Sequence, residues 1–155
     1  MTQLASSVPM TVSALQGMAA GSVVMTSDGG LPVEHLTPGD RIVTRSGLRR
    51  LRAVVVAVAD FAMLVRIGKD TLGVGRPETA IIVGPGQPVL IRDWRAQALF
   101  GQAQAMVPAQ RLVDGTLIAL QMQRDARLFM LEFDMPEVAY VGGLQLGCAS
   151  QTVTA

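Results

Sequence analysis

Residues 21–47, which read GSVVMTSDGGLPVEHLTPGDRIVTRSG, constrain the fold more than any other part of the chain. An apolar run at 23–25 is followed by a turn cluster, a proline-led segment and a second alternating run at 41–44. Between them, residues 37–40 read Thr-Pro-Gly-Asp, and proline followed by glycine at the two central positions sets the backbone angles of a type II turn. The flanking runs are therefore predicted to be strands joined by tight turns.

The same pattern continues to the end of the chain, because Gly, Pro and Asp turns separate short apolar runs about every eight to twelve residues, as in all-β proteins. Further strands are predicted at 48–60, 63–67, 71–74, 80–83, 89–91, 102–107, 116–123, 127–133, 137–140 and 144–146. The run at 48–60 is long for a strand, so it is expected to contain a bend or a bulge. Residues 93–100 fit either a strand or one helical turn. Residues 108–113 suit a short helix that begins with Pro108.

Length and composition predict one folded domain. The chain has 155 residues, of which 50% are hydrophobic and 16% are charged, so it can form a packed core and is not expected to be disordered. A chain of this length buries roughly 70% of its unfolded surface. We expect an extended lead-in over 1–16, the domain over 17–147 and a tail over 148–155.

The charges and the rare residues exclude several classes of site. A net charge of +1 supplies no field for nucleic acid or for an anionic membrane. The basic residues Arg49, Arg50 and Arg52 alternate with or adjoin apolar positions, which favours outward-facing strand positions over a phosphate groove. One cysteine and one histidine cannot form an internal disulfide or a metal cluster. No cofactor, metal or nucleic-acid partner is predicted.

No run reaches the roughly 18–20 apolar residues needed to span a bilayer, and the longest, 53–63, is interrupted by Asp60. Residues 1–20 are apolar and rich in small residues, but no Lys or Arg precedes them, so a Sec-type signal peptide is not predicted. The sequence predicts a soluble protein that is cytoplasmic by default. Export by a route without an N-terminal signal stays open.

The ordered set of segments resembles the Hint (hedgehog/intein) domain family, and within it the bacterial branch of free-standing or fused domains. Residues 20–47 are similar to its pattern of small residue, strand, turn, PVE-x-L-x-PGD and strand. Residues 72–118, from LGVGRPETAIIVGPGQPVLI to LVDGTLI, are similar to its middle block. The likeness runs from about 17 to 146. It implies an all-β, flat, pseudo-symmetric horseshoe of long curved strands, with at most one or two short helical turns.

The resemblance also implies a chemistry. Working Hint domains begin with a Cys or Ser that attacks the preceding carbonyl, and a downstream Thr-x-x-His or Ser-x-x-His assists, because imidazole can protonate the leaving amine. The nucleophile position matches Gly17 in this chain. The hydroxyl position of the downstream motif matches Gly84, and its histidine position matches Gln87. A carboxamide has no useful pKa and cannot serve as the proton donor.

A third position also differs from the family pattern. Members of this branch often carry a histidine in a segment that resembles residues 128–137, and the matching residue here is Met130. Asp134 and Glu137 are the acidic residues left in that segment. There is no terminal His-Asn pair of the splicing type. With Gly17, Gly84, Gln87 and Met130 in these places, the resemblance indicates a vestigial catalytic site.

Two functions of different classes follow, and a third reading stays open. The first is a catalytically inactive Hint-like domain that acts as a protein-binding or assembly module, with the partner held by an exposed strand edge or by an emptied cleft around Gly17 and Gln87. The second is an autoprocessing domain that cleaves itself by an N-to-O acyl shift with Ser22 as a non-standard nucleophile. The third is a remnant that folds without a function. Partner identity and oligomeric state are not predicted.

Other single residues carry alternatives that the sequence leaves open. His35 is either a solvated turn residue or a proton-transfer group, and the Ser22 hydroxyl either serves the backbone or attacks. Cys148, expected beyond the last strand, is either an inert thiol or a site of oxidation or acyl transfer. Trp94 either covers the edge of the core or is an exposed docking residue. The nine methionines either fill gaps in the core or form an adaptable surface.

Overall fold

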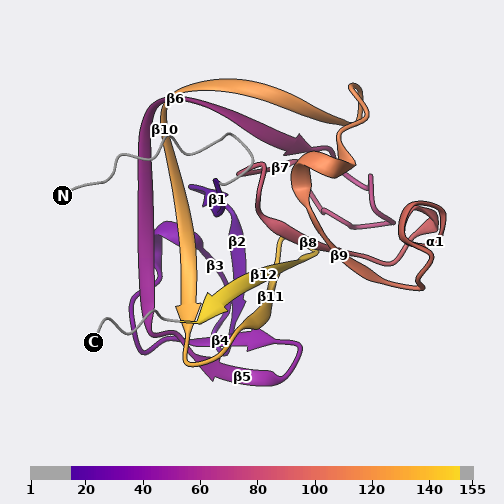
Figure 1. The fold of residues 1–155 in the computed structure, drawn as a ribbon. Coiled ribbons are helices and arrows are strands. Elements are labelled where there is room, and N and C mark those ends of the chain that lie inside the picture. The colour runs from indigo at the N-terminus through magenta and orange to yellow at the C-terminus, as the bar shows by residue number, and fades with distance from the viewer. Residues whose placement is uncertain (1–14, 151–155) are drawn as a thin grey trace.

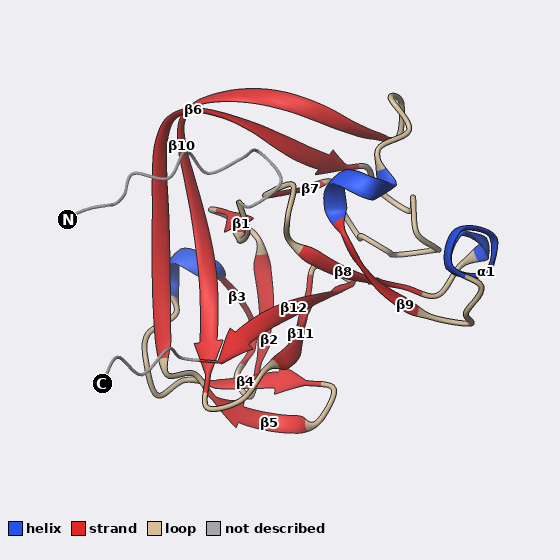
Figure 2. Ribbon diagram, viewed as in Figure 1, coloured by secondary structure: helices blue, strands red, loops and turns tan. Residues whose placement is uncertain are grey.

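Twelve strands, one α-helix and two 3-10 turns make up the regular structure of residues 15–150, the part of the chain that this computed structural model describes (Figures 1 and 2). The strands are β1 (Met18–Ala19), β2 (Val23–Thr26), β3 (Gly29–Pro32), β4 (Arg41–Thr44), β5 (Gly47–Arg50), β6 (Ala53–Ile67), β7 (Ile81–Val83), β8 (Pro88–Ile91), β9 (Ala105–Pro108), β10 (Ile118–Phe133), β11 (Glu137–Val141) and β12 (Leu144–Ser150). The helix is α1 (Trp94–Phe100), and the 3-10 turns are η2 (Val33–His35) and η3 (Ala109–Leu112). The predicted all-β class is confirmed.

The strands pair in the order β1-β7-β6-β10-β12-β11-β2-β4-β5. Strand β3 pairs with β2, whereas β8 pairs with both β12 and β9. The short strand β1 also pairs with β10. The start of the described chain therefore lies between β7 and β10. This arrangement places the positions that the family resemblance singled out.

The longest pairing joins β6 and β10 in an antiparallel ribbon that turns sharply at the upper left of Figure 1. The register runs from Ala53 opposite Glu132 to Ile67 opposite Ile118 and is interrupted only near the turn, where Asp125 has φ 48°. One bent strand was predicted over 48–60, but this run is divided between β5, which ends at Arg50, and β6, which begins at Ala53, is bent and continues to Ile67. Separate strands around a turn at 124–125 were predicted, and this is wrong because β6 carries β10 through the bend as one strand.

The predicted turn at 37–40 is confirmed. The amide of Asp40 donates to the carbonyl of Thr37 at 3.1 Å, and Gly39 has φ 100°, as the third position of a type II turn requires. The Asp40 carboxylate accepts the Thr37 amide at 2.9 Å and closes the loop a second time. Strands β2 and β4 begin and end close to the predicted runs.

Two other predictions need correction, and one open alternative is resolved. Residues 71–74 are turns and bends, not a strand. The undecided segment 93–100 is helical, because Asp93 caps the N-terminus of α1 through the amide of Arg95 at 3.0 Å. Residues 148–150, expected in a tail, are the last residues of β12, while 151–155 lie outside the described residues, as do 1–14 of the predicted lead-in.

The core is mostly aliphatic, with two buried phenylalanines. Its largest fully buried side chains include Phe133, Met18, Ile42 and Leu51. A second, smaller cluster of Ala62, Leu64, Ala126 and Leu128 forms at the bend of the ribbon, and Leu15 packs against it. This cluster fixes the point at which the lead-in reaches the domain.

The sequence left open whether Trp94 and the methionines belong to the core or to the surface, and the structure places most of those that it describes on the surface. Trp94 is 66% exposed at the start of α1, a helix that Figure 1 shows at the right-hand extremity of the fold, so it does not cover a core edge. Its ring instead lies 4.9 Å from the Arg95 guanidinium. Among the methionines of residues 15–150, only Met18 is buried, which favours the adaptable-surface interpretation.

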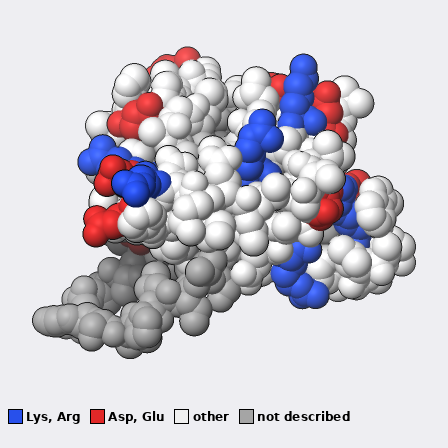
Figure 3. All heavy atoms as spheres, turned by 90° about the horizontal axis from the view of Figure 1, so that it is seen from above, with Lys and Arg blue, Asp and Glu red and all other residues white. Residues whose placement is uncertain are grey.

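Charged side chains of both signs are interspersed on the surface. Seen from above the bend, Lys and Arg alternate with Asp and Glu across a largely uncharged face (Figure 3). None of the helices in the described part of the chain has the length and apolar character needed to cross a membrane.

Candidate functional site

The pairing of β1 brings the four positions matched to the family's catalytic residues together. Met18 lies opposite Phe129 of β10 and opposite Val83 of β7. Because both pairings are antiparallel, the preceding residue, Gly17, falls next to Met130 on one side and Gly84 on the other. The amide of Gly84 donates to the carbonyl of Gly17 at 2.9 Å. The sheet register therefore converges on Gly17.

Gly17 occupies a place that suits glycine alone. Its φ of 105° lies in the region that side chains disfavour. An added Cβ would stand 3.0 Å from Met130 Cγ, 3.0 Å from the Phe129 carbonyl oxygen and 3.1 Å from Leu128 Cβ. A nucleophilic side chain here would need both a strained backbone and movement of β10.

Gln87 ties the site together with its carboxamide. Its Oε1 accepts the amide of Gly17 at 2.8 Å, and its Nε2 donates to the carbonyl of Gly147 at 2.7 Å and of Pro88 at 3.1 Å. The residue is buried, and its acceptor and both donors have partners. A neutral carboxamide can hold these backbone groups without titrating, which is a structural role.

The last two residues of the lead-in, Leu15 and Gln16, contact the site. The amide of Gly86 donates to the carbonyl of Leu15 at 2.7 Å, alongside the bond from Gly84 to Gly17. An added Cβ at Gly84 would overlap the Leu15 carbonyl, so the glycine makes room for the lead-in backbone. The hydroxyl expected at this position in the family would compete with the lead-in for the same space.

The expected open cleft around Gly17 and Gln87 is filled. The cavity lined by Gln87 and Met130, together with Gln16, Met18 and residues of β12, measures about 30 Å³. The cleft is filled only next to Gln87, because an open pocket of about 380 Å³ adjoins this cavity and is lined by Gln16, Pro88, Gly147 and Cys148 among others.

Cys148 borders this cavity from β12, where it lies opposite Glu137. Burial raises the pKa of its thiol to about 12, with the nearby Glu137 carboxylate adding to the rise and a backbone hydrogen bond from Ala139 opposing it. A thiol with this pKa is protonated at neutral pH and is a poor nucleophile. The geometry supports the inert alternative.

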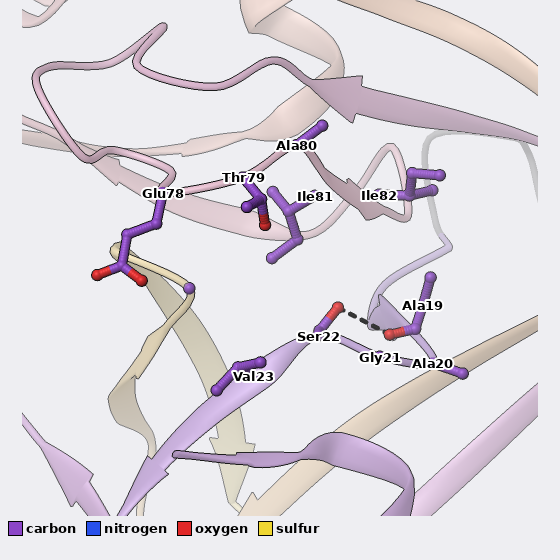
Figure 4. A pocket seen from close by; sticks show the side chains of 11 residues that line it. Ala19, Ala20, Gly21, Ser22, Val23, Glu78, Thr79, Ala80, Ile81 and Ile82 are labelled. Carbon is purple, nitrogen blue, oxygen red and sulfur yellow. Dashed lines mark hydrogen bonds between the residues drawn. The ribbon is translucent and has the colours of Figure 1, made fainter. Parts of the chain in front are cut away.

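Ser22 lies outside this cluster, beside a pocket of about 260 Å³ (Figure 4). Figure 4 shows Ser22 on one wall and Glu78 and Thr79 on the other. The Ser22 hydroxyl donates to the carbonyl of Ala19 at 2.7 Å, and its amide donates to the same oxygen at 3.2 Å. The hydroxyl therefore serves the turn between β1 and β2.

Glu34 is a site residue that sequence reasoning missed. Its Oε1 accepts the amide of Gly21 at 2.7 Å, and this hydrogen bond lowers the pKa of the carboxyl below its ordinary value. The contact holds the Ala20–Gly21 peptide, one before the Gly21–Ser22 bond. The PVE pattern named this position in the family resemblance but gave no indication of its partner.

The remaining ionisable candidates lie elsewhere. His35 is exposed in η2. The Asp134 carboxylate accepts two hydrogen bonds from Arg52, at 2.7 and 2.9 Å, and the pKa of its carboxyl is lowered by that guanidinium. Glu137 binds the hydroxyl of Ser46 at 2.5 Å. Within residues 15–150, His, Cys, Asp and Glu form no group of three or more that could hold a metal ion.

Comparison with known proteins gives two findings on the family and the fold. A family model described as Hint domain matches residues 16–151. The bacterial intein-like domain from Clostridium thermocellum has a similar fold, with a TM-score of 0.60 at 12% identity over 88% of this chain and 99% of that one. The gp41-1 intein has a TM-score of 0.56 at 9% identity over 87% and 98% of the two chains.

The MchDnaB-1 intein carrying the change N145AA has a TM-score of 0.51 at 14% identity over 86% of this chain and 99% of that one. No curated protein matches the sequence. These similarities confirm the predicted fold, and at such low identity they carry no conclusion about activity.

Proposed function

The chain belongs to the Hint domain family, and we propose that it is a catalytically inactive member that acts as a protein-binding or assembly module. The observation that carries the proposal is the geometry at Gly17. The position matched to the nucleophile has no side chain, and its amide is held by the buried carboxamide of Gln87.

The chemistry of an acyl shift supports the same proposal. The reaction needs an atom that attacks the preceding carbonyl and an acid that protonates the leaving amine. Gly17 supplies no such atom, and the Gln87 carboxamide cannot give up a proton at any accessible pH. Loss of a nucleophile or of its base costs many orders of magnitude in rate. A site that lacks both is suited to holding the chain rather than cutting it.

The contacts of Leu15 favour binding of a partner at an exposed strand edge over binding in the cleft around Gly17 and Gln87. Leu15 lies against Gly84 and its carbonyl accepts the amide of Gly86, so a partner peptide at that place would have to displace Leu15. Binding is therefore expected at an exposed strand edge, where backbone groups and apolar side chains meet the solvent.

Intact mass tests the absence of cleavage. A tag is fused ahead of Met1 in the full chain, and the purified protein is treated with hydroxylamine or dithiothreitol, which trap esters and thioesters. We expect one mass, that of the uncut fusion. Scission between residues 15 and 23 that Ser22→Ala abolishes and Ser27→Ala leaves unchanged would overturn the proposal.

The second candidate is self-cleavage at Ser22, favoured by the pocket beside this residue. In the first step, Ser22 Oγ would bond to the carbonyl carbon of Gly21, the Gly21–Ser22 C–N bond would break, and the Ser22 nitrogen would take up the hydroxyl proton. Water would then hydrolyse the resulting ester and separate the two parts of the chain. In the structure, however, the hydroxyl and the amide of Ser22 both donate to the Ala19 carbonyl. No imidazole lines the pocket, so this candidate stands second.

A further inference from the structure

The outer edge of β6 has no partner strand over residues 53–64, within the described part of the chain. On one side β6 pairs with β10 along nearly its whole length. On the other side it pairs with β7, and only at Val65, Arg66 and Ile67. Figure 1 shows the lower arm of β6 as the left-hand border of the ribbon. Alternate residues of such an edge present unpaired backbone N–H and C=O groups.

Residues 53–59 of this edge lack the charges, prolines and glycines that usually prevent strands from associating. Residues 53–59 read AVVVAVA, without a charge, a proline or a glycine. Val55, Val56 and Val58 are 37%, 42% and 69% exposed. A segment of six or seven residues with high β-propensity and low charge readily adds a further strand. An exposed edge of this composition is expected to pair with a further strand.

We propose that this edge pairs with a second copy of this chain, so that β6 of one copy lies antiparallel to β6 of the other along residues 53–59. The proposal rests on the proposed function, because it names the partner of the assembly module. A strand that pairs with itself about a two-fold axis forms an isologous contact, so two copies close on each other and leave no free patch for a third. The sheet would then run β10–β6–β6–β10 across the two chains.

Charge selects the register of this pairing. Asp60 is the single charged residue between positions 53 and 65, and Arg52 immediately precedes the strand. An axis through Val56 places Asp60 of one copy opposite Arg52 of the other. An axis through Asp60 itself would place two carboxylates face to face, which is unfavourable. The self-complementary order of charges favours the first register.

Arg52 can accept this second partner without leaving its first. Its Nε and Nη2 bind the Asp134 carboxylate within one chain. A guanidinium has five N–H donors, so those on Nη1 are left for Asp60 of the second copy. In the same register Val54 faces Val58 and Val56 faces itself, so β-branched side chains meet across the new pairing.

Light scattering after size exclusion tests the proposal on the full chain. We expect a species of twice the 16.4 kDa chain mass. The double variant V56K/V58K is expected to elute at the mass of one chain, because lysines on an edge oppose strand pairing. The control L120K/M122K places the same charges on exposed positions of β10 and is expected to leave the mass of two chains unchanged.

Asp60→Lys tests the register separately, since it replaces an attraction with a repulsion at both ends of the pairing. We expect it to raise the dissociation constant of the dimer at least about tenfold. Circular dichroism on each variant establishes that the fold is intact. One chain mass at every concentration, an open series of larger species, or a dimer unaffected by V56K/V58K would each overturn the inference. An uncut monomer would leave the proposed absence of catalysis standing, whereas a dimer that cleaves itself would overturn that absence and not the pairing.

Discussion

The site around Gly17 and the outer edge of β6 differ in whether their backbone N–H and C=O groups have hydrogen-bond partners within the described chain. At Gly17, the amide, the carbonyl and the neighbouring Gln87 carboxamide all have partners within the chain. Along residues 53–64 of β6, one side of the strand has none within the described residues. The first region is therefore expected to govern stability, and the second to govern association.

The largest expected effect concerns Cys148, which borders the filled site. Because the pKa of its thiol is about 12 in the folded chain against an ordinary 9.0, the thiolate fraction near neutral pH falls about a thousandfold. We expect iodoacetamide to label the folded chain about a thousand times more slowly than the chain unfolded in urea, as measured by mass spectrometry. Equal rates would mean that the region around Gly17 opens freely.

The same shift in pKa makes the stability of the fold depend on pH. Between its unfolded pKa of about 9 and its folded pKa of about 12, Cys148 holds its proton in the folded chain and loses it in the unfolded one. Its contribution to stability is thus complete below about pH 9 and is lost as the pH rises toward 12. Cys148→Ala is expected to flatten that alkaline decline in urea titrations.

Gln87→Ala is expected to lower the free energy of unfolding by about 3 kcal/mol. The change leaves the Gly17 amide and the Gly147 carbonyl without their partner in a buried site, and each such group costs about 1–3 kcal/mol. Chemical denaturation gives the value. Gln104→Ala, at an exposed position, is the matched control and should change it little. If Gln87→Ala lowered the free energy of unfolding by less than about 1 kcal/mol, water would have to reach the Gly17 amide and the Gly147 carbonyl in the variant.

Gly84→Thr is expected to expel the lead-in, because the new Cβ would overlap the Leu15 carbonyl. Overpacking of this kind costs about 1–3 kcal/mol. The clearest measurement is amide hydrogen exchange, in which the amides of residue 84 and Gly86 should lose the protection they have in the unchanged chain. Ala80→Thr, on an exposed residue before β7, controls for the threonine itself. Unchanged protection would contradict the competition between hydroxyl and lead-in.

The smallest effect is expected at the edge of β6. The side chains of Val56 and Val58 are exposed, so replacing both with lysine should change the stability of the single chain by no more than about 0.5 kcal/mol. Denaturation measured at a concentration low enough to separate the copies tests this. A large loss would show that these valines belong to the core of the chain, and the contrast between the two regions would fail.

The sequence predicted best where the structure is local. The turn at 37–40 depends on the order of four residues, and it formed as expected. The family resemblance also named Gly17, Gly84, Gln87 and Met130, which the registers of β1 bring together. Neither source indicated the bond between Gln87 and Gly17, because its two ends are 70 positions apart and a glutamine has no preferred partner.

Errors arose where pairing overrides local preference. Residues 124–125 read as a turn, but β6 holds β10 in register on both sides of Asp125 and the strand continues. For Trp94 the sequence left a place at the core edge and an exposed place open, and the cap at Asp93 starts a helix that turns this side chain outward. In both cases a contact or cap decided what composition could not.

The sequence by itself determined the all-β architecture, because turn residues and alternating runs act over a few neighbouring positions. It also determined that the position matched to the nucleophile has no side chain. Only the tertiary structure decided that Leu15 lies against Gly84, that Gln87 binds the amide of Gly17, and that β6 has no partner strand along residues 53–64 within the described chain. Burial and strand pairing depend on residues far apart in the chain, and those distances exist only after folding.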